Sequence, residues 1–478
     1  MPARNRLSSL TTPTPRPRQR TTAPGTRWAA VLALIIGIAC GTAEPATADP
    51  APVAPPMGWN SWNSGIALNE KSVEATIDAM VASGMRDAGY RYVNLDAGWA
   101  APERDAAGNI QADPTSFPHG MAAIAAYAHD HGLLLGLYSS PYNQICGQTP
   151  DNASLGHEEA DARTFATWGI DYLKYDWCGP DTDHDTQVPV FTAMRDALRH
   201  SGRDIFYSIN PDSSPDPDLT TVYDWSGIAD MSRIDNDLVP IWHNPLPTDG
   251  VPAGLFTMLG VTELFDAATR APRHSGPGFV DDPDMLVVGI QMAEYLGSHM
   301  NSIETTPPVE QLPPAQRAAI GQLFTLPPDV LTALNQPVVS LTETEQRTHF
   351  SLWAMLAAPL IAGNDITTMS EQTRELLTNR EVIAVDQDPL MAQGAALPGD
   401  NRVVVKPLAD GSAAVALVNW SDTPATIETT ATAVGLPAAR DYTVRDLWDR
   451  TTTDSTGPLT ASAVPPHGVV LLRVTPGR

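Results

Sequence analysis

A strand-like run in the chain ends with residues suited to acid, base or nucleophilic chemistry. Residues 168–178 read Trp-Gly-Ile-Asp-Tyr-Leu-Lys-Tyr-Asp-Trp-Cys, so that Lys174, Asp176 and Cys178 alternate at its end. Positions two apart in a strand point to the same face, so we expect Lys174 and Asp176 to face the same way. A single Asp that ends a strand is also a common helix cap or loop residue. Its surroundings therefore decide whether Asp176 is a candidate for catalysis.

Other polar side chains follow further predicted strands in the same manner. They are Asp96, Tyr138, Asn210, Arg233 and Asp237, with Asp282-Pro-Asp284 later in the chain. Crowding carboxylates together costs stability unless they are used, so the pattern predicts a polar pocket. The aromatic residues near it could stack on a sugar ring, although each is equally an ordinary core residue. These aromatic residues are Trp59, Trp62, Trp99, Tyr138 and Trp177.

The elements that position these residues alternate between strand and helix. Strands are predicted at residues 92–96, 133–138, 171–176, 204–210, 231–235 and 360–362, and helices at residues 73–88, 121–131, 158–168 and 188–201. This βαβ order is typical of a parallel sheet in an α/β protein. At this chain length it predicts a closed (β/α)8 TIM barrel, whose chemistry lies at the carboxyl ends of its strands.

The pattern changes after residue 397. Residues 402–474 contain alternating, β-branched runs separated by Asp-Gly and Pro turns, and they lack helical periodicity. This predicts a C-terminal antiparallel β-sandwich. We therefore divide the chain into a signal peptide at 1–48, a Pro-rich linker at 49–56, a catalytic barrel at 57–395 and the sandwich at 396–478.

The first residues have the pattern of an export signal. Arginines precede an apolar run at 28–39, and Ala46-Thr-Ala48 precedes Asp49. The apolar run is short for a membrane span, so we predict a signal peptide cleaved after Ala48 and a secreted, extracellular protein. A single-span anchor and a lipid on Cys40 are the alternatives.

Charge narrows the range of partners. The chain has 29 Lys and Arg against 55 Asp and Glu, a net charge of −26. Removal of residues 1–48 takes away six Arg and one Glu and leaves a net charge of about −31. Such a surface repels nucleic acid and anionic lipid, so neutral small molecules or neutral sugars, such as a neutral oligosaccharide or polysaccharide substrate, remain the expected partners. Chain length and composition say nothing about the oligomeric state.

Two cysteines, Cys146 and Cys178, remain after signal cleavage. In an oxidising exterior they are expected to form one disulfide, and two buried free thiols are the alternative. The sequence has no CxxC motif and no His-rich cluster, so we predict neither a metal site nor a cofactor.

Five separate motifs, in order, resemble those of glycoside hydrolase family 27, the α-galactosidase or melibiase family. They begin at Pro55 (PPMGWNSWN), Tyr90 (YRYVNLD), Gly169 (GIDYLKYDWC), Asp282 (DPDMLVVG) and Thr348 (THFSLWA). The resemblance continues to the carboxyl terminus, where the run from Pro465 (PPHGVVLLR) is similar to the family's sandwich domain.

The resemblance implies roles for individual residues. Asp176 would be the nucleophile, and Asp237, which follows Arg233 at the family's four-residue spacing, would be the general acid/base rather than Asp235. A retaining glycosidase needs two such carboxyls about 5–5.5 Å apart. Lys174 would bind a sugar hydroxyl and keep Asp176 ionised. The remaining implied substrate-binding residues are Asp96 deep in the pocket, Trp62 and Tyr138 on its walls, Asn210, Arg233, and Asp284 on its rim; the implied disulfide is Cys146–Cys178.

The sequence departs from the family pattern around the sugar. Ala97 stands where the family usually has a second Asp, and Ser140 and Asn210 replace the usual Asp and a Cys-Glu-Trp-like element. A pocket that loses a hydrogen-bond acceptor discriminates differently among sugars. We therefore expect an exo-acting α-galactosidase as the first hypothesis. The alternatives are the same mechanism on an α-N-acetylgalactosaminide, a β-L-arabinopyranoside or an isomaltose-type α-glucan, and a non-catalytic sugar-binding barrel.

Overall fold

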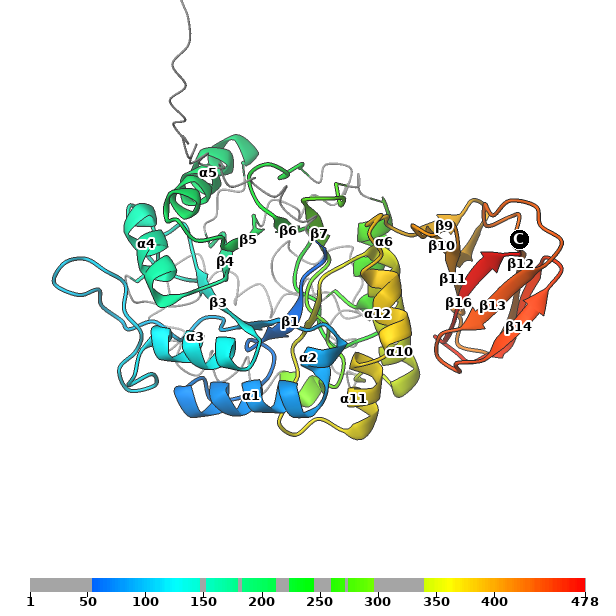
Figure 1. The fold of residues 1–478 in the computed structure, drawn as a ribbon, viewed down its shortest axis with the longest axis horizontal. Helices are drawn as coiled ribbons and strands as arrows, with labels where there is room; N and C mark the ends of the chain where they lie inside the picture. Colours follow the sequence, from blue (N-terminus) through cyan, green and yellow to red (C-terminus); the bar gives the residue numbers. More distant parts are fainter. Residues whose placement is uncertain are drawn as a thin grey trace, which may run out of the picture. The chain divides into compact units, whose positions relative to one another are not determined.

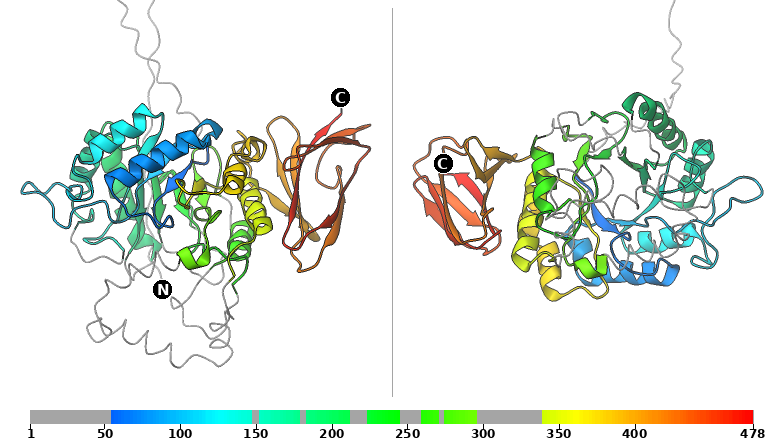
Figure 2. Two further views of the ribbon diagram at one scale, coloured as in Figure 1. Left: turned by 90° about the horizontal axis from the view of Figure 1, so that it is seen from below. Right: turned by 180° about the vertical axis from the view of Figure 1, so that it is seen from behind.

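Eight parallel strands form the larger sheet of the computed structural model (Figures 1 and 2). The structure describes residues 54–146, 152–178, 183–211, 223–244, 259–270, 274–295 and 339–477. The predicted signal peptide, residues 1–48, lies outside them. Within these ranges, no helix is long and apolar enough to cross a membrane.

The strands of the larger sheet are ordered as a barrel. They are β1 (Met57–Asn60), β2 (Tyr92–Asn94), β3 (Leu134–Ser139), β4 (Tyr172–Asp176), β5 (Phe206–Asn210), β6 (Met231–Arg233), β7 (Val280–Asp282) and β8 (Leu360–Ala362). Their order is β7-β6-β5-β4-β3-β2-β1-β8. Leu286, just after β7, closes the ring, because its backbone N–H donates to the carbonyl of Ile361 in β8 (2.8 Å). The predicted α/β barrel is confirmed.

Helices form the outer layer around these strands (Figures 1 and 2). They are α1 (Glu70–Ala82), α2 (Met85–Ala88), α3 (Met121–Asp130), α4 (Glu158–Trp168), α5 (His184–His200), α6 (Val261–Arg270), α10 (Glu343–Leu356), α11 (Glu371–Leu377) and α12 (Arg380–Asp386). The single helix predicted at 73–88 is wrong. Two helices are found, because Gly84 adopts a left-handed conformation (φ 84°) that interrupts helical geometry.

Antiparallel strands form the second part of the structure. They are β9 (Ala395–Leu397), β10 (Asp400–Pro407), β11 (Ala413–Val418), β12 (Ala425–Thr430), β13 (Tyr442–Asp446), β14 (Thr452–Ser455), β15 (Pro458–Val464) and β16 (Val469–Pro476). One sheet has the order β14-β13-β16-β11-β10-β9, and β12 pairs with β15 in the other. Buried apolar side chains from both sheets form their own core. The predicted β-sandwich is confirmed.

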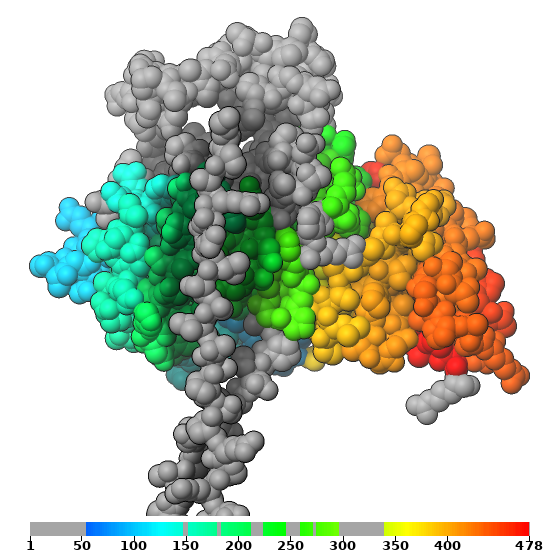
Figure 3. Space-filling model, turned by 90° about the horizontal axis from the view of Figure 1, so that it is seen from above, coloured from blue at the N-terminus to red at the C-terminus, as the bar shows by residue number. Residues whose placement is uncertain are grey.

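The barrel and the sandwich are joined by a buried lysine. Helix α10 lies against β11 and β16, and Figure 3 shows the yellow residues beside the orange ones. Lys406 of β10 is fully buried and donates to the carbonyl of Ala354 near the end of α10 (2.9 Å). Burial lowers the pKa of Lys406 to about 8, although the carboxylates of Asp386 and Asp388 oppose this. Burial has the opposite effect on the carboxyl group of Asp386 and raises its pKa.

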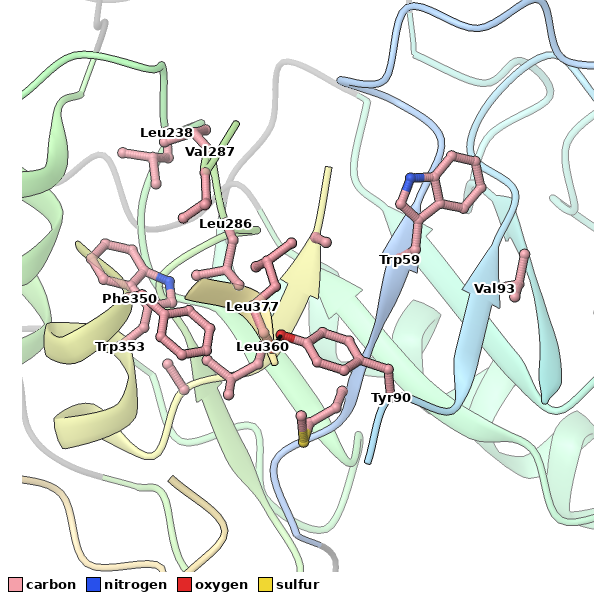
Figure 4. Close-up of a cluster of buried hydrophobic side chains, with 14 of the residues drawn as sticks. Trp59, Tyr90, Val93, Leu238, Leu286, Val287, Phe350, Trp353, Leu360 and Leu377 are labelled. Atoms are coloured by element: carbon pink, nitrogen blue, oxygen red, sulfur yellow. Dashed lines mark hydrogen bonds between the residues drawn. The ribbon is translucent and has the colours of Figure 1, made fainter. Parts of the chain in front are cut away.

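The barrel core continues between β8 and the last helices. Figure 4 shows Phe350 and Trp353 of α10 beside Leu360 of β8 and Leu377 of α11. Trp353 is fully buried, and its indole N–H donates to the carbonyl of Asp284 (2.8 Å). The helix thus fixes the backbone that follows β7, from which one candidate site residue projects.

His349 makes the stability of this core depend on pH. It is fully buried, and burial lowers its pKa to about 3. Its Nε2 faces the backbone N–H of Val287 (3.2 Å) and accepts from it in the neutral ring. In the unfolded chain a histidine binds a proton below about pH 6.5, so acidification below that value favours unfolding by about 1.4 kcal/mol per pH unit. The loss stops at the folded pKa, near pH 3.

We expect the variant His349→Gln to lose less stability than the parent between pH 6.5 and pH 4, because the titration is removed while an acceptor for Val287 is kept. Urea unfolding at both pH values measures this difference. Replacement of the exposed His157 by Gln is the control and should leave the pH dependence as it is in the parent. Equal pH slopes for His349→Gln and the parent would contradict the prediction.

Candidate active site

One cavity of about 480 Å³ lies where the barrel strands end. All nine residues that the sequence singled out for catalysis or substrate binding line it: Trp62, Asp96, Tyr138, Lys174, Asp176, Asn210, Arg233, Asp237 and Asp284. Their strands are parallel, so their carboxyl ends meet at one face of the barrel. The barrel therefore brings together side chains that are as much as 222 positions apart in the sequence.

Asp176 ends β4 and is buried, with 8% of its surface exposed. Lys174, on the same face of the strand, places its ammonium 3.5 Å from Asp176 Oδ2 and 2.8 Å from Asp96 Oδ2. Burial raises the pKa of Asp176 to about 7, Lys174 opposes this rise, and the carboxylate of Asp96 adds to it. The Oδ1 atom of Asp176 has no hydrogen-bond partner among the residues described.

Lys174 remains charged in this environment. Burial alone would lower its pKa, but the carboxylates of Asp176 and Asp96 outweigh burial and raise it well above the usual value. The ammonium also lies 5.2 Å from the centre of the Tyr138 ring, which is a cation–π distance. The same oxygen of Asp96 also accepts from the side-chain amide of Asn60 (3.0 Å). One fixed cation thus lies between the carboxylates of Asp96 and Asp176.

A second charged cluster follows β6. The guanidinium of Arg233, 5% exposed, lies 3.1 Å from Asp237 Oδ1 and 3.1 Å from Asp284 Oδ1. The Asp237 side chain is 63% exposed, so it lies at the mouth of the cavity. Asp235 instead accepts from the backbone of Asn236 and offers only its main-chain carbonyl to Arg233. The geometry therefore favours Asp237 over Asp235 as the second acidic group.

The expected place of Asp284 on the rim is wrong. Asp284 is only 3% exposed, and its Oδ2 accepts from the backbone N–H of Leu238 (2.7 Å). Burial raises its pKa, which the charge of Arg233 opposes. Its backbone is left-handed (φ 82°), which is rare for a residue other than glycine and is concentrated at functional sites. Asp284 thus ties the loop that carries Asp237 to the base of the cavity.

Two residues of the site were not predicted from the sequence. Asn60, at the end of β1, bonds to Asp96 and positions the backbone of Trp62 through its Oδ1 (2.8 Å). The run Met-Gly-Trp-Asn carried no alternation that would have identified a strand end there. Tyr295 lines the cavity, from a stretch without any motif. Burial raises the pKa of its hydroxyl, so Tyr295 stays protonated.

The predicted disulfide between Cys146 and Cys178 is confirmed. It joins residues 32 positions apart, and Cys178 comes two residues after Asp176. A crosslink that closes a loop of this length stabilises a protein by about 3–4 kcal/mol in the chain-entropy description. It therefore restrains the chain beside Asp176.

We expect the double variant Cys146→Ser/Cys178→Ser to lose about 3 kcal/mol of unfolding free energy. Urea titration measures the loss, and dithiothreitol should lower the midpoint of the parent but not that of the double variant. An unchanged midpoint in both experiments would contradict a stabilising disulfide.

Profiles of known families match both parts of the structure. The one described as "Alpha galactosidase A" matches residues 54–294 and 321–388, and "Alpha galactosidase C-terminal beta sandwich domain" matches residues 398–474. The chain belongs to glycoside hydrolase family 27. Its place in family 27 makes it a glycoside hydrolase and accounts for a polar, carboxylate-lined cavity at the barrel's catalytic face.

Individual α-galactosidases are similar to this chain over most of their length. Alpha-galactosidase A of Cellvibrio japonicus is 36% identical over 440 residues, covering 88% of this chain and 92% of the relative. The alpha-galactosidase of Cyamopsis tetragonoloba is 34% identical over 429 residues, covering 88% and 86%. The crystal structure of alpha-galactosidase I from Mortierella vinacea superposes with a TM-score of 0.70 at 29% identity, covering 89% of this chain and 98% of that one.

The pKa of Asp176 leads to a prediction for this family 27 member. A carboxyl that acts as a nucleophile must be ionised, so kcat/KM should fall tenfold per pH unit below about pH 7. Because the charge of Lys174 lowers the pKa of Asp176, Lys174→Met should move this acid limb to higher pH. Aryl galactoside kinetics across the pH range measure it, with Lys71→Met, at an exposed position, as the control. An acid limb that stays in place in Lys174→Met would contradict the assignment.

Proposed function

We propose that the protein is an exported, retaining exo-α-galactosidase in which Asp176 is the nucleophile and Asp237 the general acid/base. The proposal rests on one observation: two carboxyl groups, from the ends of β4 and β6, open into the same cavity in different electrostatic settings. The similarity to α-galactosidases supports the choice of sugar.

The mechanism follows from these settings. In the first step, ionised Asp176 attacks the anomeric carbon, the glycosidic bond breaks, and Asp237 gives its proton to the departing oxygen. In the second step, Asp237 takes a proton from water, whose oxygen replaces Asp176 at the anomeric carbon. The sugar leaves with its original configuration, and both carboxyl groups return to their starting states.

Arg233 lies among several carboxylates of the cavity. Its guanidinium interacts electrostatically with the carboxylates of Asp284, Asp237 and Asp282. One cation is thus shared among several acids, and burial raises the pKa of Asp282 to about 6. The charge of Arg233 opposes this rise in the pKa of Asp282.

A substrate panel tests the proposed function. The purified protein is incubated with aryl glycosides of α-galactose, α-N-acetylgalactosamine, β-L-arabinopyranose and α-glucose, and with dextran. We expect turnover of the α-galactoside, release of single galactose units from an oligosaccharide, and α-galactose as the first product in proton NMR. First release of β-galactose would contradict a retaining mechanism.

A second candidate is the same mechanism acting on another sugar. It is favoured by Ala97, which lines the cavity beside Asp96 where the family usually presents another carboxylate. The missing acceptor weakens recognition of one hydroxyl. Turnover in the panel with a different glycoside, and none with the α-galactoside, would support this candidate.

Export is part of the proposal. It is supported by the sequence of residues 1–48, which lie outside the described structure, and by a disulfide that an oxidising compartment permits. Intact mass measurement of protein from the culture medium should give a chain that starts at Asp49. A chain in the cell fraction that keeps residue 1 would contradict export.

A further inference from the structure

The loop that carries Asp237 continues to a buried tryptophan. Five residues after Asp237, Trp242 is 9% exposed, and its carbonyl accepts from the backbone N–H of Thr262 (3.0 Å). Between them, the carbonyl of Pro240 accepts from the backbone N–H of Leu341 (3.2 Å). The backbone of the loop is therefore bonded to the barrel at Pro240 and Trp242, and the side chains around the Trp242 ring also influence its place.

Those neighbours belong to the sandwich. The Trp242 ring stacks on His467, with ring centres 4.9 Å apart and an angle of 14° between the planes. It also stacks on Trp420, at 5.9 Å and 28°. Trp420 follows β11 and His467 lies between β15 and β16. An indole from the loop of the proposed acid/base thus contacts two rings of the other domain.

His467 is held from several sides. Its Nδ1 lies 2.6 Å from Glu345 Oε1 of α10, and its Nε2 lies 3.1 Å from Asp422 Oδ1 of the sandwich. Its carbonyl accepts from the hydroxyl of Thr348 (2.7 Å). Both ring nitrogens thus contact carboxylates, and these contacts fix the plane of the ring against which Trp242 packs.

We propose that His467, Trp242 and Trp420 are positioning residues, through which the sandwich sets the place of the loop that carries Asp237. The inference rests on the proposed role of Asp237 as acid/base. The Asp237 side chain is 63% exposed and paired with Arg233, so its place depends on the backbone of the loop as well as on that ion pair. Catalytic groups are sensitive to such shifts, since misplacement by about 1 Å costs about 100-fold in rate.

The test compares two substrates whose leaving groups differ in their need for a proton. This comparison separates a loss of acid catalysis from a general loss of activity. A dinitrophenyl α-galactoside departs without a proton, whereas melibiose needs one from the acid. If the substrate panel identifies a preferred sugar other than galactose, the corresponding two glycosides of that sugar are used instead. We expect His467→Asn to lower kcat/KM for melibiose about 100-fold and that for the dinitrophenyl substrate less than about tenfold. Asn is chosen because residue 467 is left-handed (φ 54°), a conformation that Asn tolerates.

A matched control removes a different contact between the barrel and the sandwich. Trp448 of the sandwich donates to Ser351 of α10 (2.9 Å) and contacts Phe350, away from the loop of Asp237. Trp448→Ala should lower the Tm while changing kcat/KM for both substrates by the same factor. If His467→Asn does not fold, Trp420→Leu carries the same comparison, because it removes the second ring from Trp242.

The outcomes distinguish this inference from the proposed function. Asp237→Ala is measured beside the other variants. Strong leaving-group dependence in Asp237→Ala and in His467→Asn supports both. Dependence in Asp237→Ala alone, or equal losses on both substrates in His467→Asn and Trp420→Leu, overturns the positioning role. Absence of leaving-group dependence in Asp237→Ala itself overturns the assignment of the acid and, with it, this inference.

Discussion

Replacement of Asp176 by alanine is expected to lower kcat on every glycoside by about 10⁴-fold or more, because a covalent nucleophile has no substitute. Lys174 and Asp96 remain in place in this variant, and their 2.8 Å contact persists without Asp176. The substrate should therefore still bind. Initial rates on an aryl galactoside measure the loss, and isothermal titration with galactose measures retained binding.

Azide provides the decisive control for Asp176→Ala. The small anion fits the space of the lost carboxylate and attacks the anomeric carbon from the same side, so it should restore turnover of an activated aryl substrate and give β-galactosyl azide. The same anion should not accelerate the parent in this way. Near-normal turnover of Asp176→Ala without azide would remove Asp176 from the mechanism.

Replacement of Asp237 by alanine should have the second largest effect. Loss of a general acid costs about 10²–10⁴-fold, and the cost should be greatest for substrates whose leaving oxygen needs a proton. Turnover of a dinitrophenyl substrate should then be limited by the second step, in which water has lost its base. Azide should accelerate that step and give α-galactosyl azide, the opposite anomer from the Asp176 variant.

Asp235→Ala is the matched control for Asp237→Ala, since both residues line the cavity and follow Arg233. The Asp235 side chain accepts a hydrogen bond from the backbone of Asn236 and forms no ion pair with Arg233, so its loss should change kcat far less. If Asp235→Ala and Asp237→Ala exchanged these phenotypes, the four-residue spacing from Arg233 would have led to the wrong acid.

The sequence was informative where side-chain pattern and backbone geometry coincide. The alternation of Lys174 and Asp176 requires a strand and places both side chains on one face, and the structure has both in one cavity. Strand β1 carries no such signal, because Met-Gly-Trp-Asn is buried at all four positions. Its close approach to β2 needs Gly58, whose Cβ would lie 2.5 Å from the Tyr92 carbonyl.

The burial of Asp284 could not be predicted for a related reason. Its place depends on a left-handed backbone, on the indole of Trp353 that holds its carbonyl, and on the guanidinium of Arg233. These partners come from α10 and β6, distant in the sequence. Local pattern indicates that such a residue is polar and near a strand end, but tertiary packing decides whether it lies at the rim or the base.

The buried ammonium of Lys406 has a consequence for how the molecule comes apart. It belongs to the sandwich, yet its hydrogen-bond acceptor, Ala354, belongs to the barrel. Separation of the two parts would break this hydrogen bond and expose apolar side chains of α10, β11 and β16 that are buried in one common core. Heat should therefore melt the barrel and the sandwich in one calorimetric transition, and a chain shortened at residue 395 would be a poor stand-in for the whole enzyme.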